Sequence, residues 1–316
     1  MARGMEFTGG PFGTVAADSA ALVPASISGK VFYVNANAGG TDDKDAPWPD
    51  VDGVLCFSTL QAAIDACVDG RGDTIYVKRG GEAVTTAVNF NCAGIRVIAQ
   101  RFGMNPSARG EYTSIYSTTI TDGPCAIISK YCYIEGLAFA GADATGSTTG
   151  FFAGAALKIG DGSTNVYGVH LKQCRFPKWD LDNSHGISID GTADVSNVLI
   201  EECEFEGAFA SGIYVEGSVG HVQIKNCTFA LCTYAIETGS FYAAGIYTQL
   251  LIGPGNVTIT PTKGINQTSN NVVLATVYGN YWGTAVASTH SDTVTNMETD
   301  GYICVGNYYL NEERNN

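Results

Sequence analysis

Three stretches near the middle of the chain align without gaps and decide the fold. Residues 165–176 read NVYGVHLKQCRF, residues 194–205 read DVSNVLIEECEF, and residues 218–229 read SVGHVQIKNCTF. They share the pattern V-x-x-V-x-[LI]-x-x-C-x-F, and their cysteines are 29 and 24 residues apart. A repeat with this period indicates a solenoid, in which each repeat forms one turn and packs against its neighbours.

The spacing inside one repeat predicts short β-strands. Val169 and Leu171 are two residues apart, and so are Cys174 and Phe176. Alternation with period two is typical of strands that bury one face, and the repeat has no apolar pattern of helix length. The two residues between the pairs, Lys172-Gln173, are expected to turn a corner.

Each repeat continues into a further short strand, so we expect about three strands per turn. These strands are predicted at Gly186–Ile189, Gly212–Val215 and Ala235–Thr238. Stacked turns place like residues over one another, which predicts an inward ladder of Cys174, Cys203 and Cys227. We expect these cysteines to be free thiols, because they occupy apolar strand positions where cysteine behaves as a small hydrophobe. The chain length predicts about eight to ten turns of roughly 4.8 Å each.

The repeat resembles the right-handed parallel β-helix of the pectate-lyase-like proteins over roughly residues 73–310. The resemblance implies an all-β, single-stranded solenoid. The resemblance predicts the fold but not the activity, because this fold occurs in lyases, hydrolases, phage tailspikes and non-enzymatic virion proteins.

The beginning of the chain resembles the entry of the same family. Strand Val31–Val34 precedes a loop rich in Asp and Gly, and FSTLQAAID at residues 57–65 precedes GDTIYV at residues 72–77. Ser58-Thr-Leu-Gln61 reads as a capping box, so we expect an amphipathic helix that closes near Gly70. Its apolar face would carry Leu60, Ala63, Ile64 and Cys67. In the family this helix caps the open end of the first turn.

We expect four segments along the chain. Residues 1–30 are an N-terminal docking arm, residues 31–72 hold the entry strand, the Asp-rich loop and the capping helix, residues 73–310 form the β-helix, and residues 311–316 are a polar tail. The arm is rich in Gly, Ala, Ser and Thr, so it buries too little of itself to offset its own ordering entropy. It is therefore expected to order on another protein surface.

The net charge and hydropathy of the chain limit the classes of partner that it is expected to bind. The net charge is −14, from 31 acidic and 17 basic residues, which argues against binding to a phosphate backbone. No apolar run reaches the length of a membrane span. The first residues lack the apolar core of a signal peptide, so we expect synthesis in a reducing cytoplasm. We expect neither nucleic acid nor membrane as a partner.

The longest insertion in the repeat is the best candidate for a catalytic site. It lies between Phe176 and Ile187 and contains Trp179, Asp180, Asp182 and His185. A tryptophan beside carboxylates can serve as a sugar platform next to an acid–base pair.

His185 also begins a stretch, HGISI, that resembles the GHGISI motif of polygalacturonases. Ser184 replaces the first glycine, and the paired aspartates and the RIK sequence of that family are absent. The alternative is that residues 186–189 form an ordinary strand of the solenoid.

No cofactor is expected, with calcium as the one alternative. Five aspartates lie between residues 42 and 52, and their carboxylates could hold Ca²⁺. The weak candidate ligands are Asp42, Asp43 and Asp45; the alternative is a solvated loop. Glu201 and its acidic neighbours are most simply a solvated face, and His170 has no partner pattern for a metal.

Two functions of different classes follow. The first is a non-enzymatic virion structural protein: a capsid decoration or cement protein, or a phage tail appendage. It would dock through its arm onto virion proteins such as the capsid lattice, and form a homo-oligomer such as a trimer. The alternative is a polysaccharide-degrading or glycan-binding β-helix, a tailspike-like hydrolase or lyase. Only this alternative would make the protein an enzyme.

Overall fold

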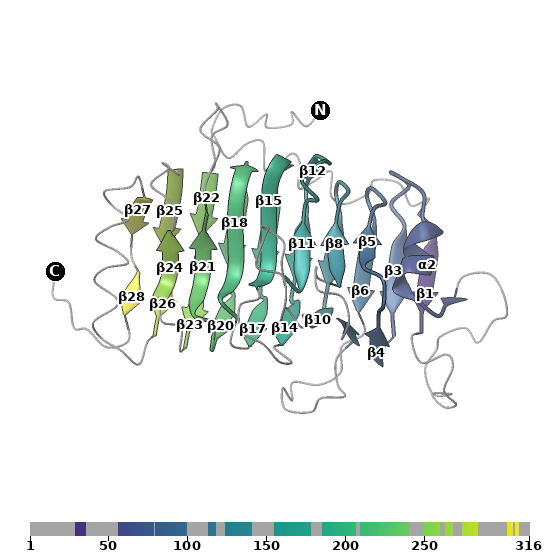
Figure 1. Ribbon diagram of the computed structural model, residues 1–316, viewed down its shortest axis with the longest axis horizontal. Helices are drawn as coiled ribbons and strands as arrows, with labels where there is room; N and C mark the ends of the chain where they lie inside the picture. The colour runs from purple at the N-terminus through teal and green to yellow at the C-terminus, as the bar shows by residue number, and fades with distance from the viewer. Residues whose placement is uncertain are drawn as a thin grey trace, which may run out of the picture.

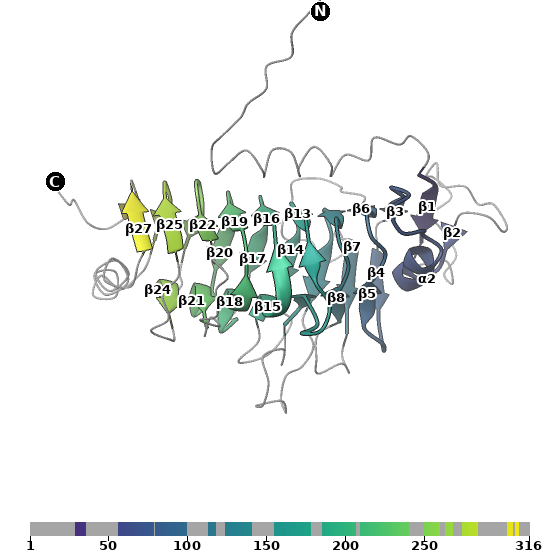
Figure 2. The same ribbon diagram turned by 90° about the horizontal axis from the view of Figure 1, so that it is seen from above.

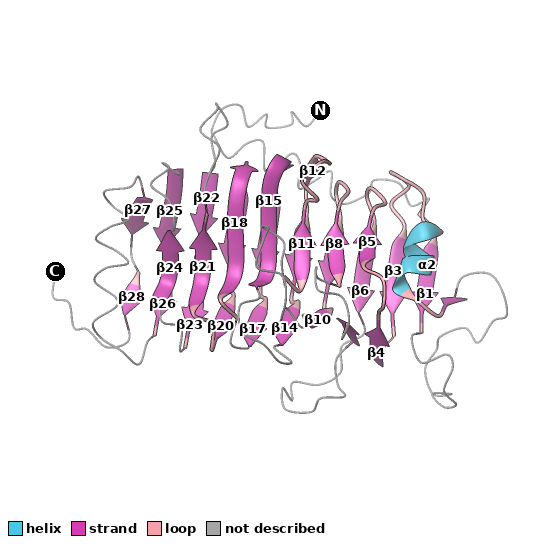
Figure 3. Cartoon of the chain, viewed as in Figure 1, coloured by secondary structure: helices cyan, strands magenta, loops and turns pink. Residues whose placement is uncertain are grey.

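In the part of the chain that the structure describes, nearly all of the regular structure is β-strand, arranged in three parallel sheets that run along one axis (Figure 1, Figure 3). The computed structural model describes residues 29–35, 56–78, 80–99, 113–117, 124–140, 155–177, 185–206, 209–239, 249–259, 263–267, 274–283, 302–305 and 307–309. Among these residues, no helix is long and apolar enough to cross a membrane.

The three sheets are named A, B and C. In spatial order, the described strands of sheet A are β2 (Cys56–Phe57), β1 (Val31–Val34), β3 (Thr74–Val77), β6 (Arg96–Ala99), β9 (Tyr133–Glu135), β13 (His170–Lys172), β16 (Val198–Glu201), β19 (Val222–Lys225), β22 (Gln249–Ile252), β25 (Leu274–Tyr278) and β27 (Tyr302–Val305). Those of sheet B are β4 (Gly80–Ala83), β7 (Thr113–Tyr116), β10 (Ala138–Ala140), β14 (Arg175–Pro177), β17 (Glu204–Glu206), β20 (Thr228–Ala230), β23 (Val257–Thr258), β26 (Tyr281–Trp282) and β28 (Tyr308–Tyr309). Those of sheet C are β5 (Val88–Phe90), β8 (Cys125–Ile127), β11 (Leu157–Ile159), β15 (His185–Ser196), β18 (Ser211–Val219), β21 (Tyr234–Thr238) and β24 (Lys263–Gln267), and β12 (Val166–Tyr167) pairs with β15.

The chain visits sheets A, B and C in turn, so each turn has about three strands, as the repeat predicts. Every pairing is parallel and joins a strand to its copy one turn away; Leu171 pairs with Ile200, for example, and Ile200 with Ile224. The nine described strands of sheet B lie within the predicted eight to ten turns. The prediction of an all-β parallel solenoid is confirmed.

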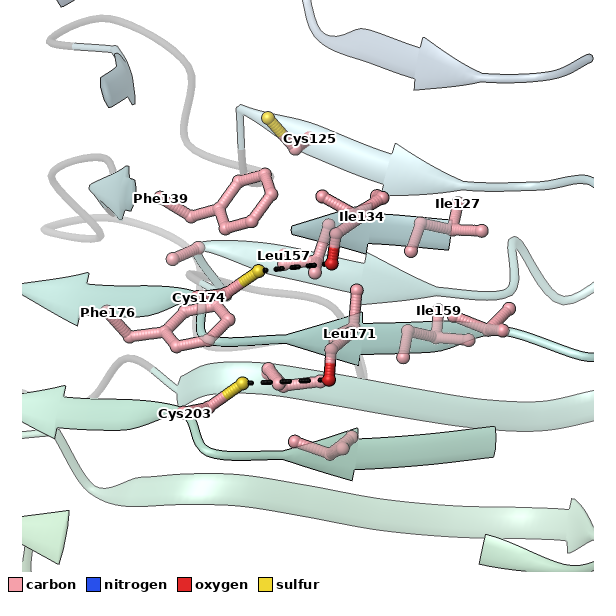
Figure 4. Close-up of a cluster of buried hydrophobic side chains, with 14 of the residues drawn as sticks. Cys125, Ile127, Ile134, Phe139, Leu157, Ile159, Leu171, Cys174, Phe176 and Cys203 are labelled. Atoms are coloured by element: carbon pink, nitrogen blue, oxygen red, sulfur yellow. Dashed lines mark hydrogen bonds between the residues drawn. The ribbon is translucent and has the colours of Figure 1, made fainter. Parts of the chain in front are cut away.

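The core consists of ladders of like residues. Phe176, Phe205 and Phe229 stack with ring centroids 4.7 Å apart, and Phe139 extends the stack at 5.6 Å. Stacked parallel strands repeat at about this spacing, so one aromatic ring per turn forms a continuous column. Figure 4 shows two of these rings beside the buried sulfur atoms.

The predicted cysteine ladder is confirmed. Cys174, Cys203 and Cys227 are buried at the corner between sheets A and B, and all three are free thiols. The Sγ atoms of Cys174 and Cys203 lie 3.6 and 3.9 Å from the carbonyl oxygens of Ile134 and Leu171 one turn away (Figure 4).

Asparagine takes over this corner position farther along. Asn256 and Asn280 are fully buried. The Asn256 amide donates to the Ile224 carbonyl and accepts from the Cys227 N–H, both at 2.9 Å. Asn280 donates to the Ile252 carbonyl at 3.0 Å.

Helix α2 (Leu60–Asp65) packs against β1, β3 and β5 at the start of the solenoid (Figure 2). Its apolar face buries Leu60, Ala63 and Ile64, three of the four predicted residues. The fourth, Cys67, lies beyond the end of the helix and is half-buried against the core. It therefore covers the open end of the first turns.

The predicted ends of this helix are wrong. The N-cap is Thr59 rather than Ser58, because the Thr59 hydroxyl accepts the Ala62 N–H at 3.2 Å. The helix stops at Asp65 instead of near Gly70. Beyond it, the Val68 N–H donates to the Asp73 carboxylate at 2.9 Å, which draws the chain out of the helical path.

Candidate active site

The outer face of sheet C gathers ionisable side chains at consecutive turns. Strands β15, β18 and β21 are in register there, with Ile187 beside Ile213 and Ile213 beside Ile236. These isoleucines point into the core. Because neighbouring side chains alternate between the two faces of a strand, the residues between them point outward.

Asp190 and Glu216 form the centre of this face. They are paired in register on β15 and β18, so their backbones are about one strand spacing, roughly 4.8 Å, apart. Both are nearly screened from solvent, at 3% and 4% exposure. Burial raises the pKa of Glu216, the Tyr214 hydroxyl lowers it, and the nearby Asp190 raises it again, with a net increase. Glu216 therefore keeps its proton to a higher pH than an ordinary glutamate does.

Tyr214 holds Glu216 in place. Its hydroxyl donates to Oε2 of Glu216 at 2.6 Å, and its ring stacks on the imidazole of His185 with centroids 4.7 Å apart. Gly239 lies on the next turn, where a Cβ atom would fall 2.3 Å from the tyrosine oxygen. The absence of a side chain at Gly239 thus leaves room for the Tyr214–Glu216 pair.

His185 is neutral at physiological pH, because burial lowers its pKa to about 4. Its Nδ1 atom is buried and has no hydrogen-bond partner in the structure, although its ring packs on Tyr214. A buried polar nitrogen without a partner carries a desolvation cost. It marks a position where a ligand hydroxyl could be bound.

A third carboxylate, Glu237, continues the face on β21. It accepts hydrogen bonds from the Ser211 hydroxyl and from the Asn266 amide, the latter at 3.1 Å. Glu237 pairs in register with Tyr214. Carboxylates thus follow one another on three neighbouring turns.

The structure describes one of the four predicted catalytic-site residues, His185, and places it in this cluster. Trp179, Asp180 and Asp182 lie outside the described residues. So do the predicted calcium ligands Asp42, Asp43 and Asp45. Within the described ranges, no group of three or more His, Cys, Asp or Glu side chains is arranged to hold a metal ion.

The sequence reasoning missed Asp190, Tyr214 and Glu216, although the repeat contained the signal. Asp190 follows the strand motif Ile187-Ser-Ile189, and Glu216 follows Ile213-Tyr-Val215, at the same offset. Stacked turns bring residues at equal offsets together, so this shared offset was a signal, but the sequence analysis aligned only the apolar positions and did not extend the pattern to these outward ones.

The sequence profile of the family described as the right-handed β-helix region matches residues 159–301. Together with the three parallel sheets, this match identifies the protein's fold as a right-handed parallel β-helix. A search of curated proteins found no match.

Solved structures resemble the chain at low identity. A pectin methylesterase from Aspergillus niger in deglycosylated form is 13% identical, with a TM-score of 0.49 over 92% of this chain and 88% of that one. A pectin methylesterase in complex with a hexasaccharide is 10% identical, with a TM-score of 0.45 and 90% of both chains covered. A mannuronic acid specific polysaccharide family 6 lyase from human gut microbiota is 15% identical, with a TM-score of 0.36 over 75% of this chain and 69% of that one. Similarity at this level is not evidence that the chain shares their activities.

Proposed function

We propose that the protein is a polysaccharide hydrolase whose active site is the outer face of sheet C. The observation that carries this proposal is the pairing of Asp190 with Glu216 on adjacent turns, where Glu216 has a raised pKa. A carboxylic acid that keeps its proton, with a second carboxyl group beside it on the next turn, is the smallest set of groups that can hydrolyse a glycosidic bond.

The two carboxyl groups would have separate roles. Protonated Glu216 gives its proton to the glycosidic oxygen as the C–O bond breaks, and a carboxylate oxygen of Asp190 attacks the anomeric carbon. Water then displaces Asp190, and Glu216 accepts the proton of that water. This is the retaining route, in which the second carboxyl group acts as the nucleophile.

His185 and Tyr214 would position the substrate and the acid. Tyr214 holds Glu216 through its 2.6 Å hydrogen bond. The neutral imidazole of His185 offers its unpaired Nδ1 atom to a sugar hydroxyl. His185 is thus retained from the sequence-based site, now with a binding role beside a different pair of carboxylates.

The test is a panel of neutral, amino-sugar and uronate polysaccharides, with products measured as new reducing ends and by mass spectrometry. On the polysaccharide that is cleaved, Glu216→Gln and Asp190→Asn should each lower kcat by about 10²- to 10⁴-fold, the usual contribution of acid–base catalysis. Activity of the native protein should fall as the pH rises through the folded pKa of Glu216, because the acid must be protonated.

Asp194→Asn is the matched control, since Asp194 lies on the same strand β15 but is exposed. It should retain the native rate. If both Glu216→Gln and Asp190→Asn still cleave the polysaccharide at the native rate, the outer face of sheet C is not the active site. Folded native protein that releases no product from any polysaccharide would remove the hydrolase proposal itself.

The other hypothesis, a virion structural protein with a docking arm, remains a prediction. It depends on residues 1–30, of which only Gly29 and Lys30 are described. The trimer, the capsid partner and the virion location are likewise untested, and no described contact favours them over a glycan.

A further inference from the structure

The carboxyl group of Glu216 lies between a tyrosine on its own strand and a glycine on the next turn. Figure 1 shows β18, which carries Tyr214 and Glu216, between β15 and β21. Val215 pairs in register with Thr238, so Gly239 comes next to Glu216 in the same outward row. At the place where a further side chain would continue the row of carboxylates, the chain therefore has glycine.

The space left by Gly239 matters more than its backbone. Its φ is outside the left-handed region, so alanine would meet no backbone strain there. The Cβ atom of that alanine would overlap the hydroxyl oxygen of Tyr214, and it would lie 2.9 Å from Cζ of the ring and 3.1 Å from Oε2 of Glu216. The ring is held from its other side, because it stacks on the imidazole of His185 with centroids 4.7 Å apart. A methyl group at position 239 would therefore push the hydroxyl away from the carboxyl group.

The Tyr214 hydroxyl determines which oxygen of Glu216 carries the acid proton. It donates to Oε2 at 2.6 Å. Burial, the hydrogen bond to Glu216 and the charge of Glu237 raise the pKa of Tyr214, so the phenol keeps its own proton at neutral pH. A protonated carboxyl group has one O–H group and one oxygen that only accepts. Because Oε2 is already the acceptor, the acid proton is held on Oε1.

The ionisable groups that face Glu216 come from both neighbouring strands. Burial raises the pKa of Glu216, and Asp190 on β15 raises it as well, whereas the hydrogen bond from Tyr214 lowers it. His185, also on β15, is neutral because burial lowers its pKa to about 4. Glu237 on β21 is a further carboxylate in register with Tyr214. Among these described neighbours, Tyr214 is the one that stabilises the ionised form of Glu216.

We propose that Tyr214 and Gly239 are positioning residues for the acid of the sheet C site. Tyr214 occupies Oε2 of Glu216, so the proton that Glu216 delivers leaves from Oε1, and Gly239 keeps open the space that the hydroxyl needs. Delivery of that proton to a glycosidic oxygen rests on the proposed hydrolase activity. The positions of the hydroxyl and of the proton do not, and they can be measured in the resting protein.

The first test follows Glu216 itself, by the pH dependence of its carboxyl ¹³C chemical shift. Tyr214→Phe should raise the pKa of Glu216, because it removes the hydrogen bond that favours the ionised form. Gly239→Ala should raise it too, and the double variant should add little, because both substitutions remove one contact. Gly81→Ala is the matched control: Gly81 lies near Tyr116 in sheet B, where an added Cβ atom would fall 3.0 Å from the ring. This variant should leave the pKa of Glu216 unchanged.

Two further measurements separate positioning from a general need for glycine. Gly239→Ala should lower the melting temperature, and adding Tyr214→Phe should recover part of the loss, because the overlapping oxygen is removed. In a crystal structure at atomic resolution, below the folded pKa of Glu216, the C–Oε1 bond should be longer than the C–Oε2 bond. A longer C–O bond marks the oxygen that carries the proton.

The last measurement is activity on a polysaccharide that is cleaved. Tyr214→Phe and Gly239→Ala should each lower kcat by about 10- to 100-fold with little change in KM, since a small misplacement of a catalytic group can cost this much. The alkaline limb of activity should move to higher pH in both variants, and Gly81→Ala should keep the native profile.

The outcomes for the two proposals are distinguishable. If the native protein releases no product from any polysaccharide, the hydrolase proposal falls, while the chemical shifts and bond lengths still decide the positioning role. That role is overturned if Gly239→Ala leaves the pKa of Glu216 unchanged, if Tyr214→Phe restores no stability to Gly239→Ala, or if Oε2 carries the proton.

Discussion

At the corner between sheets A and B, one residue per turn points into the core, and its chemistry changes along the solenoid. The residue before it adopts a left-handed backbone in the cysteine turns, with φ of 52° at Gln173, 55° at Glu202 and 54° at Asn226. Glycine takes over at Gly255 and Gly279, where the same conformation has no Cβ penalty. At this tight corner, backbone N–H and carbonyl groups of the neighbouring turn need hydrogen-bond partners. The asparagine amide reaches them with shorter hydrogen bonds than the cysteine thiol does.

At this residue scale we expect Asn256→Ala to destabilise the protein by about 2–4 kcal/mol, because it leaves the Cys227 N–H and the Ile224 carbonyl buried without their side-chain partner. The shift of the urea midpoint measures the effect. Asn91→Ala, at an exposed position, should stay within about 0.5 kcal/mol of the native protein. Equal midpoints for the two variants would show that the amide ladder adds no stability.

At the scale of the element, helix α2 depends on a residue that is distant in sequence. The carboxylate of Glu82 points inward from β4 and accepts the Leu60 N–H, with Oε2 at 3.0 Å. The N–H groups at the helix N-terminus thus have two side-chain acceptors: the N-cap Thr59, and Glu82 from the first strand of sheet B. Burial raises the pKa of Glu82, and the hydrogen bond from Leu60 lowers it by less.

The consequence is a stability that depends on pH. The folded protein binds the Glu82 proton more tightly than the unfolded chain, whose ordinary pKa is 4.5. The stability that protonated Glu82 contributes to the folded protein is therefore fully present below pH 4.5 and is lost as the pH rises through the folded pKa of Glu82. Glu82→Gln keeps an acceptor for Leu60, so it should be more stable than the native protein at pH 7, with the difference vanishing near pH 4.

Thermal melting of both proteins across this pH range measures the difference. Thr59→Ala serves as the comparison, since losing the N-cap should cost about 1 kcal/mol at every pH. A constant gap between Glu82→Gln and the native protein at all pH values would contradict the assignment to Glu82.

At the scale of the whole molecule, the buried thiols report how the solenoid opens. Each turn contacts only its neighbours, so the central turns are protected until adjacent turns separate. Cys174, Cys203 and Cys227 lie in these turns and are buried, whereas Cys56 is exposed. Burial also raises the pKa of Cys174 and Cys203, which removes the reactive thiolate.

We therefore expect iodoacetamide to label Cys56 in native buffer and the three ladder cysteines only in denaturant, all with the same midpoint. Peptide mass spectrometry gives the extent of labelling at each site. Rapid native labelling of Cys203 would contradict a closed core. Ladder cysteines that stay unlabelled even after unfolding without reductant would reveal a disulfide.

The sequence alone determined the architecture, because every turn of a solenoid repeats the same short pattern of buried and exposed residues. The spacing of Val169, Leu171, Cys174 and Phe176 predicted a strand, a corner and a second strand in each turn. With the third strand that follows, stacking of the turns then gives three parallel sheets. It also predicted the buried face of the capping helix. It did not find the asparagine turns, since a hydrophobic template cannot recognise a buried amide as the counterpart of a cysteine.

Only the tertiary structure decided which side chains meet on the outer faces. Asp190 and Glu216 are far apart in sequence, as are Glu201, Lys225 and His170, and outward positions have no hydrophobic pattern to reveal them. The environment of each also depends on the neighbouring turns: Glu201 lies between two lysines, and Glu216 is screened beside Tyr214. Burial and partner charges set a pKa and a binding role, and both exist only once the turns are stacked.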